Sequence, residues 1–172
     1  IMCRISGFIN KNLPENKKQI LIKGLSELQE HRGPDFSGEW NTSNVHFFHQ
    51  RLSLIDGNSR SNQPFFNEDF VLCFNGEIYN FLALKQHLPS VNFTTTSDTE
   101  VLFQYLIHFG IEKTLRDIKG MFAFSFYEVK KKELFLVRDR FGIKPLFFVN
   151  NSEVFAFASE SRTLAKGLQL KP

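Results

Sequence analysis

Cys3 is the first residue whose type and position could support covalent chemistry, because it lies near the amino end of the printed sequence. Position alone favours a small apolar side chain buried on a first strand. The alternative requires processing that leaves Cys3 as the first residue, so that a thiol and an α-amino group belong to one residue. An α-amino group has an unperturbed pKa of about 7.7–8.0, so it can accept the thiol proton and later protonate a leaving amine.

Asn75 and Gly76 form the second candidate. Asn-Gly between apolar runs is typical of a tight hairpin turn, but the residues from Asn80 onward have a helical pattern instead of a returning strand. In the functional interpretation, the side-chain amide of Asn75 and the backbone N–H of Gly76 donate hydrogen bonds to a developing oxyanion. Loss of one such donor typically costs about 2.7–4 kcal/mol of barrier lowering.

Arg51, Glu77 and Asp98 are charged residues that could together bind an α-amino acid. The planar guanidinium of Arg51 suits a carboxylate, and the carboxylates of Asp98 and Glu77 suit an ammonium group. Taken singly, Arg51 is more simply an exposed strand arginine, and Asp98 a helix-start carboxylate that interacts with the helix dipole.

Composition excludes several other classes of protein. With 21 basic and 18 acidic residues, the formal net charge is +3, which is too balanced to indicate a nucleic-acid-binding protein. The run Lys130–Lys132 is most simply a solvated hairpin tip. Two cysteines and five histidines show no metal-ligand spacing, so no metal site is predicted.

The sequence contains no apolar run of the roughly 20 residues that span a bilayer, and no basic-then-apolar leader. We therefore expect no membrane partner. The two cysteines cannot build a disulfide scaffold, which favours a reducing compartment and a cytoplasmic location.

The first half of the chain predicts strands and helices in mixed order. Leu21, Leu25 and Leu28 form one apolar helical stripe in a helix that ends near residues 32–34. Asn80 is expected to cap a helix that runs to about Leu88. Strands are predicted over Ile5–Ile9, Val45–Ile55 and Phe70–Phe74, with His49, Arg51 and Ser53 on one face of the second and Leu52 and Leu54 on the other.

The second half predicts one long helix and then strands. The segment from Ser97 to Glu100 has the form of a capping box, and Gly110 is expected to end the helix that follows it. Four strands with short turns, which indicate antiparallel hairpins, are predicted over Met121–Val129, Glu133–Val137, Leu146–Asn150 and Val154–Ala158. With no linker or repeat, residues 1–172 are expected to form a single α+β domain with layered antiparallel sheets.

Taken in order, these segments resemble a known family. The motifs are Met2-Cys3, His31-Arg32-Gly33-Pro34-Asp35, Arg51-Leu52-Ser53-Leu54-Ile55-Asp56, Asn75-Gly76-Glu77-Ile78-Tyr79-Asn80, Ser97-Asp98-Thr99-Glu100-Val101, Gly120-Met121-Phe122-Ala123-Phe124, Arg138-Asp139-Arg140-Phe141-Gly142-Ile143-Lys144-Pro145-Leu146 and Phe157-Ala158-Ser159-Glu160. Together they are similar to the glutaminase domain of glutamine-hydrolysing asparagine synthetases, which are class II glutamine amidotransferases. The resemblance covers essentially the whole chain.

The resemblance implies an N-terminal-nucleophile hydrolase fold, a four-layer αββα sandwich of two antiparallel sheets. It implies that Cys3 is the nucleophile with its own amine as base, and that Asn75 and Gly76 form the oxyanion hole. It also assigns the glutamine α-carboxylate to Arg51 and the ammonium group to Glu77 and Asp98. The backbone of Leu52, Ser53, Leu54 and Ile55 would line the pocket.

The implied activity is hydrolysis of the glutamine side-chain amide to glutamate and ammonia. In the family, the ammonia passes to an ATP-dependent synthetase domain, absent from this chain, that makes asparagine from aspartate. ATP and Mg²⁺ are expected only there, with no cofactor in this domain, and a homodimer is left open. Two alternatives remain: an acceptor domain of another kind, such as one that amidates a surface-polysaccharide sugar acid, and a degenerate domain that binds glutamine without hydrolysis.

Four further residues set expectations about the nucleophile and its surroundings. Ile1 and Met2 precede Cys3 and, while attached, leave it with an amide nitrogen that cannot act as a base. Arg4 stands where the family usually has glycine, and a cation beside the amine would lower the pKa of that amine. Cys73 is expected on the same strand face as Asn75, as an unreactive core residue.

Overall fold

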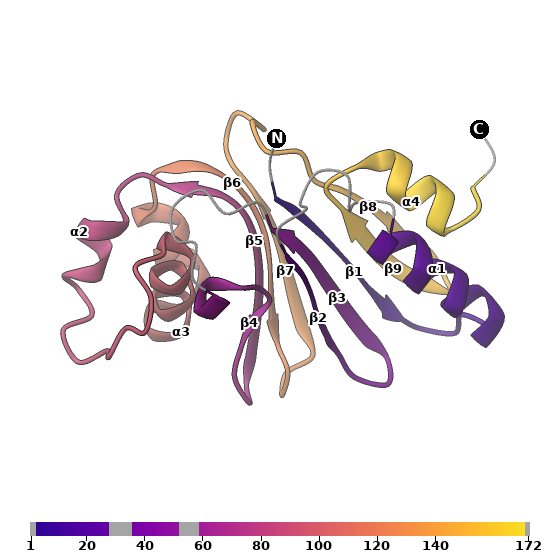
Figure 1. Cartoon of the computed structure of the whole chain (residues 1–172), viewed down its shortest axis with the longest axis horizontal. Helices are drawn as coiled ribbons and strands as arrows, with labels where there is room; N and C mark the ends of the chain where they lie inside the picture. The colour runs from indigo at the N-terminus through magenta and orange to yellow at the C-terminus, as the bar shows by residue number, and fades with distance from the viewer. Residues whose placement is uncertain (1–2, 28–35, 52–58, 171–172) are drawn as a thin grey trace.

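The computed structural model describes residues 3–27, 36–51 and 59–170. Two antiparallel sheets face each other at the centre of the molecule, and helices cover both outer faces (Figure 1). The first sheet has the strand order β2 (Phe36–Asn41), β3 (Val45–Arg51), β1 (Arg4–Asn10), β9 (Val154–Ala158) and β8 (Phe147–Asn150). The second has the order β4 (Phe65–Phe66), β5 (Phe70–Ile78), β6 (Gly120–Glu128) and β7 (Glu133–Arg138).

The helices form the two outer layers. Helices α1 (Glu15–Glu27) and α4 (Ser161–Gly167) cover the first sheet, and α2 (Phe81–Lys85) and α3 (Asp98–Asp117) cover the second. A short 3₁₀ turn, η2 (Ser59–Ser61), precedes β4. This αββα arrangement confirms the predicted four-layer fold, and none of the described helices is long and apolar enough to cross a bilayer.

Three apolar cores separate the four layers, and phenylalanine contributes to each of them. The core between the two sheets includes Phe47, Phe157 and Tyr127, with the Phe47 ring 5.6 Å from the ring centroids of both others. Because side chains alternate along a strand, Phe8 and Phe48 lie on the opposite face of the first sheet, against α1 and α4. Offset and edge contacts of this kind stabilise aromatic cores beyond their buried area.

Strand β5 is longer than the sequence predicts. It continues through Asn75 and Gly76 to Ile78, paired throughout with β6 from Phe70↔Glu128 to Ile78↔Gly120. The hairpin-turn interpretation of Asn75-Gly76 is therefore wrong, because a partner strand distant in sequence holds both residues extended. No side chain fits at Gly76, where a Cβ would lie 2.3 Å from the backbone oxygen of Met121.

Helix α3 confirms half of the predicted capping box. The Ser97 hydroxyl accepts the Glu100 N–H at 3.2 Å, but the Glu100 carboxylate does not return the bond to Ser97. It accepts instead from the N–H and hydroxyl groups of Thr94 and Thr95. Gly110 does not end the helix as expected: it forms a kink with φ 73° and ψ 172°, and helical structure resumes as far as Asp117.

The other predicted elements differ mainly in their ends. Helix α2 stops at Lys85, short of Leu88, and the Asn80 side chain does not cap it; that side chain bonds the Asp117 carbonyl and the Lys119 N–H. Two predicted hairpins are present, β6–β7 in one sheet and β8–β9 in the other. Leu28 and the predicted helix end at residues 32–34 lie outside the described residues.

We predict that Phe47→Ala lowers the free energy of unfolding by about 3–5 kcal/mol, because it leaves a cavity in a close-packed core. The Phe47 side chain is 0% exposed. The control is Phe141→Ala, whose ring is 90% exposed and whose loss should change stability by no more than about 0.5 kcal/mol. Urea unfolding followed by fluorescence measures both, and equal effects of the two variants would contradict the assignment of the inter-sheet core.

Candidate active site

The register of β1 against β3 brings two of the predicted site residues to one end of the first sheet. Arg4 pairs with Gln50 and Ile5 with His49, so the same register continued by one residue sets Cys3 opposite Arg51. Ile5 belongs to the inter-sheet core, and alternation turns Cys3, His49 and Arg51 toward the same face. Cys3 is half-buried and is not part of a disulfide.

Arg51 is a buried arginine, not an exposed strand residue as the simplest sequence interpretation holds. Its Nη1 donates to the side-chain oxygen of Asn62 at 2.7 Å, which fixes the orientation of the guanidinium. Burial of an arginine is costly unless its donors have partners. A guanidinium held in one orientation is suited to a carboxylate ligand.

Strand β5 turns Cys73 and Asn75 toward the first sheet, as alternation predicts. Cys73 is packed in the inter-sheet core, and burial raises its pKa to about 12, so this thiol is protonated and unreactive. Asn75 is 1% exposed, and its Nδ2 has no hydrogen-bond partner among the described residues. An unsatisfied buried donor costs about 1–3 kcal/mol, and such a group is expected where a ligand supplies the acceptor.

The backbone of β5 is held on the edge away from β6. The Phe74 N–H donates to the Gln63 side-chain oxygen at 2.7 Å, and the Ile78 N–H donates to Asp98 Oδ2 at 2.8 Å. Alternation of N–H directions along an antiparallel strand puts the Gly76 N–H on this same edge, between those two. Asn75 Nδ2 and the Gly76 N–H are thus adjacent donors from consecutive residues.

Asp98 and Glu77 are two carboxylates at the same end of β5. Asp98 is buried at the first turn of α3, and burial raises its pKa, an effect to which the nearby charge of Glu77 adds. The hydrogen bonds from Ile78 and Thr99 act in the opposite direction. Glu77 itself is exposed, so one buried and one accessible carboxylate lie near each other.

Lys144 is a site residue that the residue-by-residue sequence analysis missed. It lies in the loop after β7, where the Asp139 carboxylate accepts the N–H groups of Phe122, Phe141, Ile143 and Lys144 at 3.0–3.3 Å. The side chain of Lys144 is 5% exposed; burial lowers its pKa, while the charges of Cys3 and Glu77 raise it. The only signal in the sequence was the Arg138–Leu146 motif.

Arg4 does not share the face of Cys3. Its side chain is on the helix-facing side of β1, is 2% exposed, and forms an ion pair with Glu160 in which Nη2 lies 2.5 Å from Oε1. Next along the chain, the Ile5 N–H donates to the Ser159 hydroxyl at 3.1 Å, and the Ser159 N–H donates to the Ile5 carbonyl at 2.9 Å. These contacts anchor the start of β1 to the segment that leads into α4.

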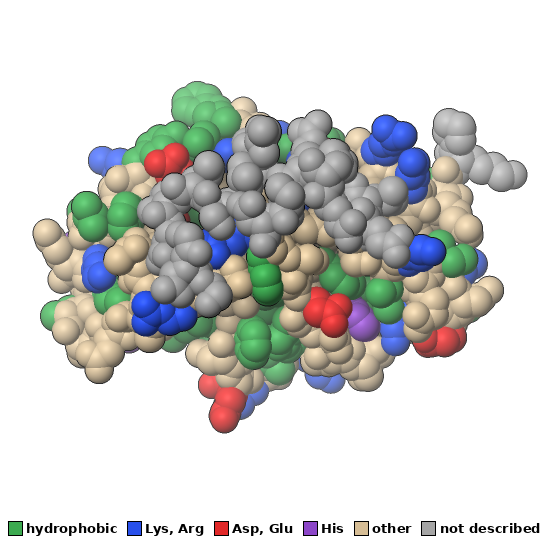
Figure 2. Space-filling view, in the orientation of Figure 1, with side chains coloured by type: hydrophobic (Ala, Val, Ile, Leu, Met, Phe, Trp, Pro, Cys, Tyr) green, Lys and Arg blue, Asp and Glu red, His purple; other side chains and the backbone are tan. Residues whose placement is uncertain are grey.

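Several predicted residues lie outside the described residues: Ile1, Met2, Leu52, Ser53, Leu54 and Ile55. Within the described ranges, no cluster of three or more His, Cys, Asp or Glu side chains could hold a metal ion. On the face shown in Figure 2, lysine and arginine side chains are dispersed among carboxylates and do not gather in one patch.

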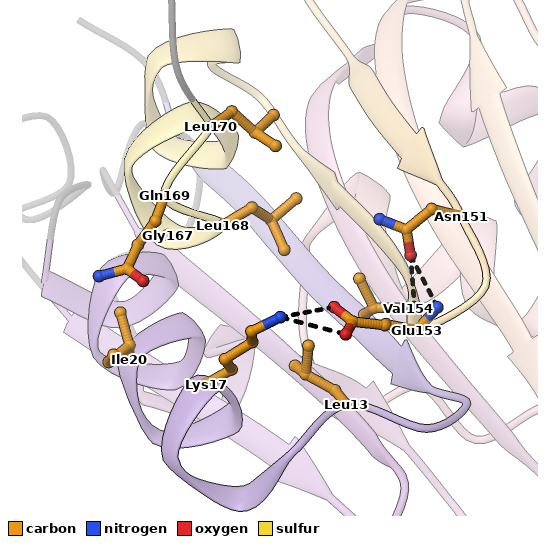
Figure 3. Close-up of a pocket in the computed structure, with 10 residues that line it drawn as sticks. All are labelled: Leu13, Lys17, Ile20, Asn151, Glu153, Val154, Gly167, Leu168, Gln169 and Leu170. Carbon is orange, nitrogen blue, oxygen red and sulfur yellow. Dashed lines mark hydrogen bonds and ion pairs between the residues drawn. The ribbon is translucent and has the colours of Figure 1, made fainter.

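A separate hollow of about 240 Å³ lies between α1, α4 and the β8–β9 turn. Figure 3 shows Lys17 reaching across it to Glu153, and the ion pair measures 3.1 Å. Leu13, Leu168 and Leu170 add apolar walls. None of the predicted site residues lines this hollow, which lies on the outer side of the first sheet.

Comparison with known proteins shows the family of this chain. The family described as "Glutamine amidotransferase domain" matches residues 2–172. Asparagine synthetase [glutamine-hydrolyzing] 2 of Bacillus subtilis (strain 168) is 41% identical over 170 residues, which cover 95% of this chain and 22% of that protein. Asparagine synthetase B [glutamine-hydrolyzing] of Escherichia coli (strain K12) is 40% identical over 151 residues, 85% of this chain and 26% of that protein.

Two solved structures share the fold. One is the glutamine phosphoribosylpyrophosphate amidotransferase from B. subtilis complexed with ADP and GMP, with a TM-score of 0.74 at 21% identity. The other is the structure of the allosteric regulatory enzyme of purine biosynthesis, with a TM-score of 0.77 at 23% identity. Each match covers 96% of this chain and 43% of the other.

We predict that His49 makes stability depend on pH. Burial lowers the pKa of His49 to about 3, against about 6.5 in the unfolded chain, so between these values the unfolded state binds the additional proton. The His49 contribution is therefore lost as the pH falls below about 6.5, by up to about 1.4 kcal/mol per pH unit. Between pH 7 and pH 5 the parent should lose about 2 kcal/mol more than His49→Gln.

Urea unfolding at the two pH values tests this prediction. The control is His108→Gln, which changes an exposed histidine on α3 and should leave the pH dependence of the parent intact. Identical pH dependence in the parent and in His49→Gln would contradict a buried neutral His49.

Proposed function

The chain belongs to the glutamine amidotransferase domain family, and we propose that it hydrolyses the side-chain amide of L-glutamine to glutamate and ammonia. The observation that carries this proposal is the buried amide of Asn75. Its Nδ2 has no acceptor among the described residues and lies on the face of β5 that is turned toward the sheet of Cys3. A carbonyl oxygen that becomes an oxyanion would supply this acceptor.

In the proposed mechanism, Cys3 is both nucleophile and base. The α-amine takes the thiol proton, and the sulfur forms a bond to the glutamine Cδ. The C–N bond then breaks as the protonated amine gives its proton to the leaving nitrogen, and ammonia departs. Water, activated by the same amine, attacks the thioester and releases glutamate and the thiol.

Asn75 and Gly76 stabilise the two tetrahedral intermediates in this proposal. Both donors belong to a strand that is paired along its whole length with β6, so they need little rearrangement when negative charge develops. Such preorganised donors are commonly the largest single contribution to catalysis of acyl transfer.

The residues that bind the α-carboxylate and α-ammonium groups of the substrate define specificity for an α-amino acid. Arg51, oriented by Asn62, binds the α-carboxylate, and Asp98 and Glu77 bind the α-ammonium group. Opposite charges placed against the two charged groups of one α-carbon select a zwitterion over an uncharged amide.

The fate of the ammonia follows from the relatives. Because the named asparagine synthetases extend well beyond the matched region, we propose that the ammonia amidates aspartate in an ATP- and Mg²⁺-dependent synthetase domain. An acceptor domain of a different kind is the second candidate. Neither of the two cysteines is in a disulfide, and one is the proposed nucleophile, which favours the reducing cytoplasm.

We predict that the protein releases ammonia from glutamine only when Cys3 is the first residue. Protein that retains Ile1 and Met2 should have little or no activity, because an amide nitrogen cannot accept the thiol proton. Intact mass establishes the amino terminus, and ammonia release is measured before and after trimming to Cys3.

A diazo-ketone analogue of glutamine supplies the control for this experiment. It should label Cys3 of the trimmed protein stoichiometrically and leave Cys73 unlabelled. Binding of glutamine without labelling or ammonia release would favour the degenerate domain, and full activity with Ile1-Met2 attached would refute the amine as base.

We predict that Asn75→Ala lowers kcat for glutamine hydrolysis by about 10²- to 10³-fold with little change in KM, because it removes a donor used mainly in the transition state. Cys73→Ala is the matched control, since it changes a side chain two residues away on the same face and should retain activity. Steady-state kinetics of both variants measure the effect. An Asn75→Ala variant with normal kcat would be incompatible with the assignment.

A further inference from the structure

Three hydrogen bonds from side chains hold the backbone N–H and carbonyl groups of Phe74, the residue directly before Asn75. Gln63 accepts from the Phe74 N–H at 2.7 Å and donates from Nε2 to the Phe74 carbonyl at 3.1 Å. His49 Nε2 lies 3.1 Å from the same carbonyl. A carbonyl oxygen has two lone pairs and can accept both bonds.

The side chain of Gln63 supplies hydrogen bonds to β5 that a neighbouring strand would otherwise supply. Strand β4 pairs with β5 only at Phe65↔Leu72 and Phe66↔Val71, so Phe74 lies two residues beyond Leu72, where this pairing ends. The carboxamide of Gln63, which is buried, offers one acceptor and one donor with the spacing of a backbone peptide. It therefore extends the hydrogen-bonded edge of β5 to the residue directly before Asn75.

His49 joins the two sheets at this point. It lies on β3, two residues before Arg51 and opposite Ile5, whereas Phe74 belongs to β5 in the other sheet. The acceptor on Phe74 requires that Nε2 carry the hydrogen, so Nδ1 is unprotonated, and Nδ1 is buried with no partner among the described residues. Burial keeps the pKa of His49 near 3, which keeps this donor unchanged across the neutral range.

The geometry points to His49 and Gln63 as positioning residues that set the distance between Cys3 and the oxyanion donors Asn75 and Gly76. This inference rests on the proposed function. Apolar packing between the sheets is non-directional, whereas a hydrogen bond fixes both a distance and an angle. Because the Phe74 carbonyl and the Asn75 N and Cα atoms share one peptide plane, holding that carbonyl also holds the Cα from which the Asn75 side chain extends.

Kinetics of His49 variants test the inference. In protein that begins at Cys3, His49→Asn, whose amide is too short to reach Phe74, should lower kcat by about 10- to 100-fold, the scale expected for a misplacement of about 1 Å. KM should change by less than about 2-fold, since uniform substrate binding is untouched. His49→Gln, with a longer amide donor, should recover most of the activity, and Gln63→Met should resemble His49→Asn.

Two chemical probes separate positioning from a general loss of structure. Alkylation of Cys3 by iodoacetamide needs no oxyanion hole and should keep the parent rate in every variant. A glutamine analogue with an aldehyde in place of the amide forms a tetrahedral adduct with Cys3, and its Ki should rise by the same factor as kcat falls. The control is His46→Asn, on the outer face of the same strand, where the ring stacks on Phe8 at 4.7 Å.

Each outcome has a defined meaning. Normal kcat in both His49→Asn and Gln63→Met, or a parallel loss of iodoacetamide reactivity, overturns the inference while the proposed function stands. Circular dichroism and the unfolding midpoint identify a variant that fails to fold. In that case His49→Gln is compared with the parent. Normal kcat together with an unchanged Ki for the aldehyde supports the donor role, and a loss of both overturns it. No ammonia release from the parent overturns the proposed function and this inference with it.

Discussion

The site depends on a directional contact between two sheets whose shared core is mostly apolar. Phe47, Tyr127 and Phe157 hold the sheets together by burial of apolar area and by close packing. These interactions tolerate a small displacement of one sheet along the other. The hydrogen bond from His49 to the Phe74 carbonyl does not tolerate such a displacement. The candidate nucleophile belongs to one sheet and the candidate oxyanion donors to the other, so their separation is a property of this interface and not of either sheet.

Carboxylates hold the surrounding backbone by accepting N–H groups that lack a strand partner. Asp139 accepts three N–H groups of the loop after β7 and that of Phe122 on β6. Glu100 accepts those of Thr94 and Thr95, and Asp98 accepts that of Ile78. Charge-assisted bonds of this kind are about twice as strong as neutral ones. They give irregular segments near the site an order that regular secondary structure supplies elsewhere.

Periodicity predicts much of this fold, because alternation and helical spacing depend on residues close in sequence. Strand β9 has the predicted limits, and Cys73 and Asn75 share a face as expected. Asn75-Gly76 shows where local rules fail, since a distant partner overrides the turn preference. His49, Gln63 and Lys144 carry no local signal for their positions, which arise from register between strands and from a loop that crosses between sheets. The roles of Cys3, Asn75 and Arg51 came from chemistry and resemblance, and they remain predictions.

The Arg4–Glu160 ion pair is relevant to the entropic cost of ordering a chain end, which catalysis by a terminal residue requires. Chain ends usually fray, and an ordered nucleophile at such an end must overcome about 1–2 kcal/mol of backbone entropy per residue. The Arg4 side chain is buried and that of Glu160 is partly exposed, and loss of Glu160 would leave the buried guanidinium without this partner. In a chain that begins at Cys3, Arg4 would be the second residue, and its ion pair with Glu160 would fasten the start of β1 to the segment before α4 while the amine stayed unattached to further chain.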